Sequence, residues 1–524
     1  MMQNKLAFNN FRRFPKFGPI EFGDITYLVG RNNSGKSTFV KAYMLMMNYI
    51  KSGQLDILDF NQNNVEDLNI VTYERAKCKS LNSADQSFID FSLQLNNLTF
   101  YLKVTGNALQ VQASVINFNI TEENSGLSLK INPSQNFVNL QWEAKSSEND
   151  GATILNFEEI IRDKTAERAK IVDDLSEAYI LLSSELENYR RELNSLKRQA
   201  REGSEQKKIY LSTHYASIDL PSLLNEIVVD FNSRYDVRFK ENQELGGKPF
   251  KETTKQFEFE SLRTYYQNAS LIKKFIEAIN DVVYNTQIKY LPATLNKQSA
   301  LFSIRDQSNS LAQAVHEFQQ LQIDKTEGDA KRFVLKWMKE NKFEIGDNFD
   351  VQLIAGESYE YNIISNGISI PLADKGMGSI QSMLLILRIA TIIYKKSKDS
   401  KKYILIIEEP ELNLHPALQS RLCEMFYEAK QRFDINFIVE THSEYVVRKS
   451  QVFVNENDLQ IAPNENPFSV IYFDKDINKE TPIWNMIYNE DGSFKNSFGE
   501  GFFDTASSIA LHLIKLRRNR ATKS

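Results

Sequence analysis

The sequence feature that most constrains the fold is the stretch G-R-N-N-S-G-K-S at residues 30–37, which has the form G-x-x-x-x-G-K-S. The apolar run Ile25–Val29 precedes it, and residues 38–47 have the pattern of a helix. A strand, a glycine-bracketed loop and a helix together form the setting of a phosphate-binding loop, or P-loop. The alternative, a glycine-containing turn without a ligand, does not explain the two flanking elements. The sequence therefore predicts binding of a nucleoside triphosphate.

Each part of this loop has an expected role. The glycines Gly30 and Gly35 let the backbone curl, so that its N–H groups converge on phosphate oxygens at a helix N-terminus. Lys36 is expected to neutralise the β- and γ-phosphates, and the Ser37 hydroxyl to bind Mg²⁺. The predicted cofactors are ATP and Mg²⁺, and the predicted binding residues of the loop are Gly30, Arg31, Asn32, Asn33, Ser34, Gly35, Lys36, Ser37 and Thr38.

Length and composition predict a soluble, cytoplasmic protein of several lobes. A chain of 524 residues is long enough for more than one core. Its formal net charge of −5 argues against a chain that is basic all over, although local basic patches could still contact nucleic acid. The cysteines Cys78 and Cys423 lie far apart, which fits a reducing compartment. The longest apolar run, Met383–Tyr394, contains Arg388 and is too short for a membrane span.

Changes in hydrophobic period predict four segments. Residues 1–150 form a β-rich ATPase lobe, 151–286 a helical or coiled-coil insertion, 287–455 a second ATPase lobe, and 456–524 an extension with a basic tail at Lys515–Arg520. The strand Ile288–Ala293 opens the second ATPase lobe, and a hairpin around Asn366-Gly367 follows. The tail is expected to be solvated, with DNA or partner contact as the alternative.

A heptad stripe marks the insertion. Apolar side chains recur at alternating spacings of three and four, at Val172, Leu175, Tyr179, Leu182, Leu186, Tyr189, Leu193 and Leu196. A second stripe, at Ile272, Phe275, Ile279 and Val282, is a plausible antiparallel partner. The pattern fits either a packed helical bundle or a protruding arm used for dimerisation or partner contact.

Two carboxylates end a predicted central strand. The apolar run 403–407 is followed directly by Glu408 and Glu409. Carboxylates at the C-terminal end of a buried parallel strand face the crevice where ligands bind. Glu408 is expected to hold Mg²⁺ or its water, and Glu409 to polarise the water that attacks the γ-phosphate. A solvated pair of glutamates is the alternative.

Two further segments complete a nucleotide-site pattern. In D-K-G-M-G-S-I-Q, residues 374–381, a glycine-flanked Ser379 precedes the apolar helix Met383–Ala390; alone it would be read as a helix cap. The strand and polar cluster F-I-V-E-T-H-S, residues 437–443, places His442 where it could reach the γ-phosphate or the attacking water. The stretch E-L-N-L-H-P, residues 411–416, lies between them.

In this order, the segments 30–38, 374–381, 408–416 and 441–443 resemble the Walker A, signature, Walker B/D-loop and switch-histidine motifs of ABC-type ATPases. More narrowly, E-E-P-E-L-x-L-H-P and T-H-S-E resemble the prokaryotic OLD-like and Septu-like ATPases, as do the opening Asn10–Phe14 and the tail 499–504. The resemblance implies an α/β fold: an ABC-type P-loop NTPase head, with a mixed β-sheet flanked by helices and an antiparallel β lobe. Arg12 of the opening is then expected in the nucleotide site.

The resemblance also implies a head-to-head homodimer or higher homo-oligomer. In it, the signature residues Gly376, Gly378, Ser379 and Gln381 of one subunit close on the nucleotide held by the other. It further implies slow ATP hydrolysis that regulates a separate effector, often a nuclease in anti-phage defence, with nucleic acid contacted through that partner. Two departures are visible: the signature reads G-M-G-S-I-Q instead of S-G-G-Q, and Glu408 stands where many relatives have Asp.

A second active site on this chain is not expected. OLD-type proteins carry a Toprim nuclease after the ATPase, and residues 443–524 are short for that domain. Asp474 and Asp476 end a predicted strand and are interpreted as a strand-to-turn boundary, with Asp491-Gly492 as the next turn. The alternative function is a DNA-repair or chromosome-structure ATPase that clamps DNA itself; a transporter ATPase is disfavoured by the long insertion.

Overall fold

A computed structural model of the chain describes residues 4–61, 68–79, 88–143, 207–229, 270–293, 302–303, 310–461, 465–474, 476, 482–499 and 502–503, with 165 and 186 as single positions. Apart from Leu186, the heptad stripe predicted between Val172 and Leu196 lies outside the described residues. So does the basic tail at Lys515–Arg520.

The centre of the molecule is a six-stranded sheet in the order β11-β16-β17-β3-β18-β19. Five of its strands are parallel, and the edge strand β19 (Ile483–Met486) runs antiparallel to β18. The parallel strands are β3 (Ile25–Gly30), β11 (Thr286–Leu291), β16 (Lys402–Glu408), β17 (Ile435–Glu440) and β18 (Phe468–Phe473). Every strand predicted for this sheet is present. Because parallel strands share one carboxyl edge, the residues that follow β3, β16, β17 and β18 meet there.

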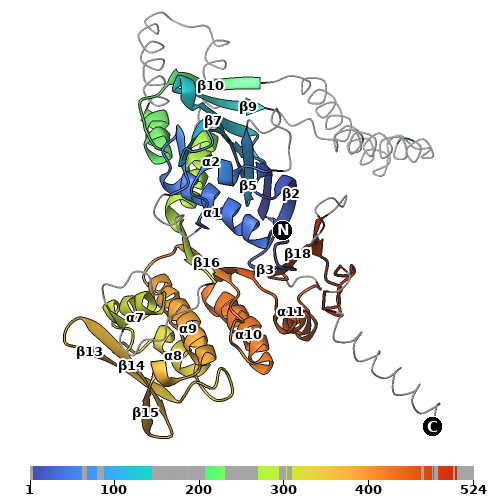
Figure 1. Cartoon of the computed structure of the whole chain (residues 1–524). Coiled ribbons are helices and arrows are strands. Elements are labelled where there is room, and N and C mark those ends of the chain that lie inside the picture. Colours follow the sequence, from blue (N-terminus) through green and yellow to red (C-terminus); the bar gives the residue numbers. More distant parts are fainter. Residues whose placement is uncertain are drawn as a thin grey trace, which may run out of the picture.

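Alternate residues of this sheet point into two different cores. Leu28, Ile406 and Ile438 pack in the core that contains α1 (Lys36–Ser52). The neighbouring side chains Val29, Ile407 and Val439 enter the second core. The helices of that core lie on the opposite side of the sheet from α1 (Figure 1), and are α7 (Ser310–Gln320), α8 (Asp329–Trp337), α9 (Met377–Lys396), α10 (Pro416–Phe433) and α11 (Glu444–Glu456).

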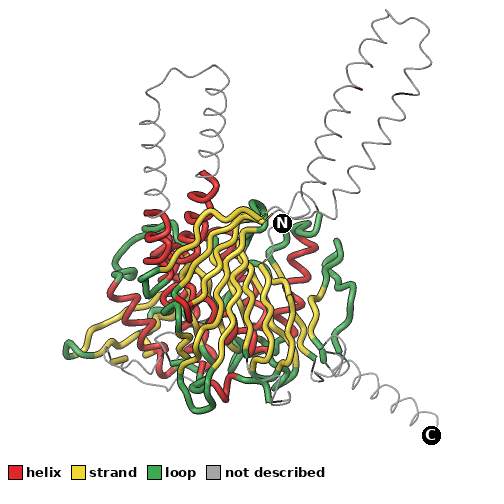
Figure 2. The backbone as a smooth tube through the Cα atoms, turned by 90° about the horizontal axis from the view of Figure 1, so that it is seen from above, coloured by secondary structure: helices red, strands yellow, loops and turns green. Residues whose placement is uncertain are grey.

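An antiparallel sheet of nine strands forms the β-rich lobe predicted at the N-terminus. Its strands run side by side in Figure 2. They are β1 (Asn4–Phe11), β2 (Phe14–Phe22), β4 (Ile57–Asp59), β5 (Ile89–Leu95), β6 (Leu98–Thr105), β7 (Gln112–Glu122), β8 (Leu127–Asn132), β9 (Phe137–Glu143) and β10 (Lys207–His214). The short elements α2 (Tyr73–Ala76) and η2 (Pro133–Gln135) lie between strands.

One strand of this sheet comes from the segment predicted as a helical insertion. Strand β10 pairs with β9 in an antiparallel register that runs from Lys207↔Glu143 to His214↔Phe137. The alternating run K-K-I-Y-L-S-T-H has the period of a strand, and Leu211 enters the core of the lobe. The β lobe therefore extends beyond the boundary at residue 150.

The second apolar stripe of the insertion is buried in the β lobe. Residues 270–285 are helical, and Ile272, Phe275, Ile279 and Val282 lie in the same core as α1. Strand β11 begins directly after this helix, at Thr286. Among the described residues, the stripe thus packs against the ATPase head, where the sequence suggested a partner helix.

A small third sheet precedes the segment 374–381. It contains β12 (Phe302–Ser303), β13 (Asn348–Ile354), β14 (Ser358–Ser365) and β15 (Ile368–Pro371). The predicted hairpin is confirmed: β14 and β15 are antiparallel, and both turn residues have positive φ, 50° at Asn366 and 77° at Gly367. The turn η3 (Leu372–Asp374) then leads to α9.

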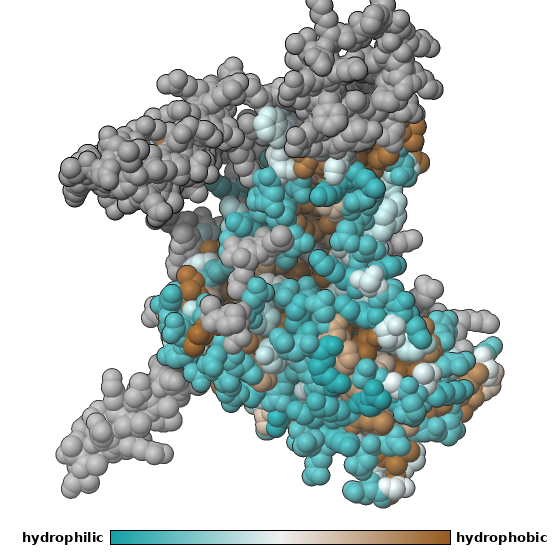
Figure 3. All heavy atoms as spheres, turned by 180° about the vertical axis from the view of Figure 1, so that it is seen from behind, coloured by the Kyte–Doolittle hydropathy of each residue, from teal (hydrophilic) through white to brown (hydrophobic). Residues whose placement is uncertain are grey.

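Helix α9 is longer than the apolar run seen in the sequence. Within the described part of the chain, it is the one helix long and apolar enough to cross a membrane by these two criteria alone. Most of its side chains are buried in the second core, and Arg388 forms an ion pair with Glu317 of α7 at 2.8 Å. The surface in Figure 3 is largely hydrophilic. The apolar character of α9 is therefore that of a core helix.

Candidate nucleotide-binding site

The P-loop has the predicted strand–loop–helix geometry. Strand β3 ends at Gly30 and helix α1 begins at Lys36. Gly30 has φ +151°, and a Cβ there would lie 2.4 Å from the carbonyl oxygen of Phe473. Gly35 has φ +108°, and its Cβ would lie 2.4 Å from the Phe14 ring. No other residue fits either position without strain, so the glycines leave a backbone cradle at the start of a helix, as phosphate requires.

The β1–β2 turn packs against this cradle. Phe14 covers Gly35, and the Arg13 guanidinium donates a hydrogen bond to the carbonyl oxygen of Asn33. Arg12, which the family resemblance placed in the site, also lines the pocket. Within the described part of the chain, the buried hydroxyl of Ser34 has no hydrogen-bond partner. An unsatisfied buried hydroxyl in a backbone cradle fits a phosphate ligand.

Lys36 is buried and contacts its own loop and the end of β17. Its ammonium group donates to the carbonyl oxygens of Gly30 at 3.1 Å and Arg31 at 3.2 Å, and to Nε2 of His442 at 3.1 Å. It also lies 3.6 Å from a carboxylate oxygen of Glu440. Burial lowers the pKa of Lys36, and the nearby glutamates oppose that shift.

Glu440, to which the sequence analysis gave no role, contacts Ser37, the residue expected to bind Mg²⁺. The Ser37 hydroxyl donates to both carboxylate oxygens of Glu440, at distances of 2.8 Å and 3.1 Å. Glu440 ends β17 and stands beside Glu408, the last residue of β16, in the parallel register. Burial raises the pKa of Glu440 to about 7, although Lys36 and Ser37 favour its charged form. Glu408 accepts a long hydrogen bond from the N–H of Ala293, at 3.5 Å.

Glu409 and His442 face each other beside Lys36. Nε2 of His442 lies 3.6 Å from a carboxylate oxygen of Glu409. Burial, together with the charge of Lys36, lowers the pKa of His442 to about 4. The ring is therefore neutral at pH 7. Because an ammonium group only donates, Nε2 accepts from Lys36 and the proton resides on Nδ1.

Glu411, which the sequence analysis gave no role, fixes the position of His442. Its carboxylate accepts hydrogen bonds from the backbone N–H of His442 at 2.6 Å and from the Thr441 hydroxyl at 2.8 Å. The side chain is buried, and burial raises its pKa. The position of Glu411 three residues after Glu408 was the signal in the sequence that could have indicated a role. The contact with His442 could not be predicted, because sequence spacing alone does not show that β16 and β17 are neighbours.

The segment expected to act as the signature lies at the N-terminus of α9. Gly376 caps the helix, and the N–H of Ser379 donates to the Gly376 carbonyl oxygen at 2.9 Å. A Cβ at Gly378 would lie 2.7 Å from the carbonyl oxygen of Asn413, so the segment packs tightly against the loop that follows Glu409. None of Gly376, Gly378, Ser379 and Gln381 is among the described residues that line the P-loop pocket of the same chain.

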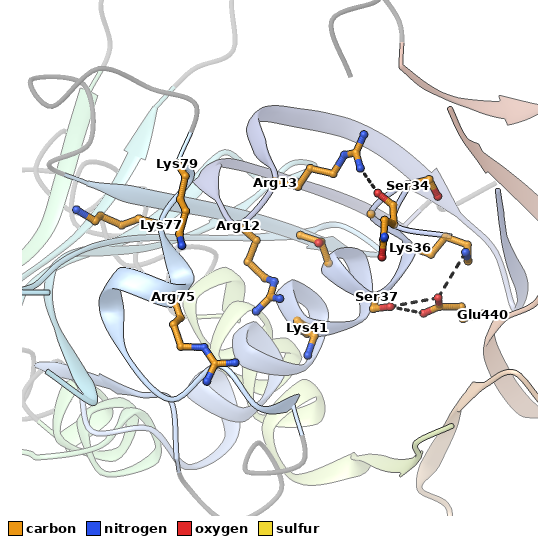
Figure 4. Close-up of a pocket in the computed structure, with 13 residues that line it drawn as sticks. Arg12, Arg13, Ser34, Lys36, Ser37, Lys41, Arg75, Lys77, Lys79 and Glu440 are labelled. Atoms are coloured by element: carbon orange, nitrogen blue, oxygen red, sulfur yellow. Dashed lines mark hydrogen bonds and ion pairs between the residues drawn. The ribbon is translucent and has the colours of Figure 1, made fainter. Parts of the chain in front are cut away.

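The pocket around the P-loop has a volume of about 470 Å³ and a strongly positive lining. Its charged residues are Arg12, Arg13, Lys36, Lys41, Arg75, Lys77 and Lys79, with Glu440 as the one carboxylate among the described lining residues. In Figure 4, Arg75, Lys77 and Lys79 lie on one side of the pocket and Lys36, Ser37 and Glu440 on the other. Burial and the charge of Arg12 lower the pKa of Lys41 to about 8. Such a concentration of cations suits a polyanion.

Residues 1–447 match the protein family described as AAA ATPase domain. The chain belongs to this family. The match spans the P-loop, Glu408 at the end of β16, Glu409 directly after it, and His442, so the pocket belongs to an ATPase domain, which has a mixed α/β fold. No curated protein matches the chain.

Solved structures similar to this AAA ATPase include Smc head domains. The head with an extended coiled coil bound to the C-terminal domain of ScpA, from Pyrococcus furiosus, is 11% identical with a TM-score of 0.34, and the match covers 98% of this chain and 99% of that one. The Smc head domain from Thermotoga maritima is 11% identical with a TM-score of 0.29, and the match covers 90% of this chain and 95% of that one.

The boundary predicted at Asp474 and Asp476 is confirmed. Strand β18 ends at Phe473, and the N–H of Asp476 donates to a carboxylate oxygen of Asp474 at 2.9 Å, as in an Asx turn. Gly492 has φ +76° in the next predicted turn.

Proposed function

We propose that this AAA ATPase binds ATP with Mg²⁺ at residues 30–38 and hydrolyses it slowly. The observation that carries the proposal is the convergence of Lys36, Glu409 and His442, which lie far apart in the sequence. Nε2 of His442 lies 3.1 Å from the ammonium group of Lys36 and 3.6 Å from a carboxylate oxygen of Glu409. The proposed ATPase lobes are residues 1–150 and 287–455, with 456–524 as the extension; of the predicted insertion 151–286, strand β10 and the helix 270–285 belong to the ATPase head.

The side chains have separate roles in this proposal. The backbone of the P-loop and Lys36 bind the phosphates, and Arg12 lies at the pocket wall. Ser37 and Glu408 are the proposed metal-side residues; when bound, Mg²⁺ neutralises charge on the β- and γ-phosphates. Glu409 orients the attacking water and accepts its proton. His442 is neutral, and Glu411 holds its backbone. In this proposal its ring contacts the γ-phosphate or the attacking water, either by donating from Nδ1 or after the ring has moved.

The substitution Glu409→Gln tests this mechanism. We expect the variant to bind ATP as wild type does, because Glu409 is not among the described residues that line the P-loop pocket, and to hydrolyse ATP at least about 100-fold more slowly. Single-turnover hydrolysis and equilibrium binding measure the two properties separately. Turnover at the wild-type rate would refute the role of Glu409.

The assembly and biological role extend the proposal. Gly376, Gly378, Ser379 and Gln381 are not among the described residues that line the P-loop pocket of their own chain, which supports a homodimer in which each copy closes the nucleotide site of the other. We place the chain in the OLD-like and Septu-like group and propose that it is cytoplasmic and regulates a separate effector, a nuclease, in anti-phage defence. Partner capture and phage sensitivity, each compared with Lys36→Ala, test this role; no partner together with unchanged phage sensitivity would refute it.

The cations across the pocket favour a second candidate function, direct contact with DNA. Arg75, Lys77 and Lys79 line the side away from Ser37. ATP-stimulated DNA binding by the isolated protein, with an affinity that falls steeply with salt, would favour this candidate. Loss of that binding in the triple alanine variant of these residues would assign it to this wall of the pocket.

A further inference from the structure

Glu440 holds both P-loop side chains that a nucleotide requires. The Ser37 hydroxyl donates to its two carboxylate oxygens, at distances of 2.8 Å and 3.1 Å, and Lys36 lies 3.6 Å from one of them. Lys36 is directed at this carboxylate and at the carbonyl oxygens of its own loop. Binding of a triphosphate therefore has to redirect Lys36 and Ser37 away from Glu440.

The Glu440 carboxylate also lies close to the place where the negatively charged phosphates of a nucleotide would bind. Ser37 is the residue that contacts the metal in a P-loop site, and the β- and γ-phosphates lie directly beside that metal. Glu440 and Glu408 end adjacent strands at this edge of the sheet, so two carboxylates face the same corner. Lys36, which contacts Glu440, is needed by the phosphates. Unless a cation compensates Glu440 at this corner of the pocket, its negative charge opposes the approach of a phosphate.

A hydrated divalent cation removes this conflict. Mg²⁺ prefers oxygen ligands and keeps several waters, and a carboxylate can hold it directly or through such a water. Glu408 accepts a long hydrogen bond from the N–H of Ala293, whereas Glu440 accepts hydrogen bonds from the Ser37 hydroxyl. Of the two carboxylates, Glu440 is therefore the one in direct contact with the P-loop.

We propose that Glu440 is a second carboxylate of the Mg²⁺ site, beside Glu408, and that it makes nucleotide affinity depend on the divalent cation. With Mg²⁺, Glu440 faces the hydrated cation while Lys36 and Ser37 turn to the phosphates and metal. Without Mg²⁺, Glu440 retains Lys36 and repels the triphosphate. This inference rests on the proposed function, because it concerns the same ATP site.

The test measures equilibrium binding of ATP to the full chain at pH 8, once with excess Mg²⁺ and once with EDTA. The variants are Glu440→Gln, which removes the charge with little change of shape, and Glu444→Gln as the matched control. Glu444 lies on α11, four residues further along, and pairs with Arg448 outside the pocket. Thermal unfolding checks that each variant is folded, and Glu440→Ala replaces Glu440→Gln if the latter does not fold.

We expect wild type and Glu444→Gln to bind ATP much more tightly with Mg²⁺ than with EDTA. In Glu440→Gln the ratio of the two dissociation constants should shrink by about tenfold or more, chiefly through tighter binding without Mg²⁺. An unchanged ratio in Glu440→Gln, or equal affinity of wild type in the two conditions, would overturn this inference and leave the proposed function intact. A wild-type chain that binds no ATP in either condition would overturn both.

Discussion

His442 is the residue whose protonation state most directly reports the electrostatics of the site. Its pKa lies near 4 because burial and the ammonium group of Lys36 both disfavour the imidazolium ion. The ring can accept from Lys36 only while it is neutral. Protonation therefore breaks a contact of the P-loop lysine and places two positive charges side by side.

This arrangement predicts a dependence of stability on pH. The folded-state pKa of His442 is lower than the unfolded value, so its contribution is present above about pH 6.5 and is lost as the pH falls toward 4. After allowance for the partial exposure of the ring, the loss should be about 1–2 kcal/mol. Chemical unfolding of wild type and His442→Gln at pH 7 and pH 5 measures it. An equal loss in both proteins would show that other groups cause it; Glu440, whose pKa is raised, has the opposite dependence.

At the scale of elements, the loop between β3 and α1 depends on the β1–β2 turn. A side chain at Gly35 would meet the Phe14 ring and would also require a positive φ. We expect Gly35→Ala to lower the free energy of unfolding by about 1–3 kcal/mol and to abolish ATP binding, because the cradle must shift.

Gly367→Ala is the matched control for this prediction. Gly367 has φ +77° in the β14–β15 turn, and nothing lies within 4 Å of the position its Cβ would take. This variant carries the backbone strain alone and should bind ATP as wild type does. Wild-type ATP binding by Gly35→Ala would contradict the account of the cradle.

The same elements show what the sequence could predict. The P-loop, the strand before Glu408 and the hairpin at Asn366-Gly367 were predicted correctly because local pattern and turn chemistry determine them. Glu440 was not assigned to Ser37, since that contact depends on β17 lying between β16 and β3. Strand β10 was missed for a similar reason: its partner β9 is more than sixty positions earlier in the chain, across residues 144–206. Strand order and long-range pairing are properties of the packed molecule.

At the scale of the whole molecule, the site is expected to be shared between two copies. The segment expected to act as the signature leads into α9 and packs on the loop after Glu409, and none of Gly376, Gly378, Ser379 and Gln381 is among the described residues that line the P-loop pocket. In a symmetric dimer, the same surface would then face the nucleotide of the other subunit.

A mixing experiment tests this sharing. Lys36→Ala removes the phosphate contact, and Ser379→Arg blocks the signature surface; each variant alone should be inactive. A mixed dimer keeps one complete site, formed by the P-loop of the Ser379→Arg chain and the signature of the Lys36→Ala chain. An equal mixture should therefore recover about a quarter of the wild-type ATPase activity per chain. No recovery after demonstrated subunit exchange would contradict the shared site.

The most direct test of the central claim is calorimetric titration of ATP with Mg²⁺ into the wild-type chain and into Lys36→Ala. Lys36 is buried among the P-loop carbonyls, Glu440 and His442, and its ammonium group donates to the carbonyl oxygens of Gly30 and Arg31. We expect wild type to bind one ATP per chain and Lys36→Ala to lose at least about 100-fold in affinity, while both unfold cooperatively. Equal affinity in the two proteins, or no binding by wild type, would contradict the assignment of this pocket as a nucleotide site.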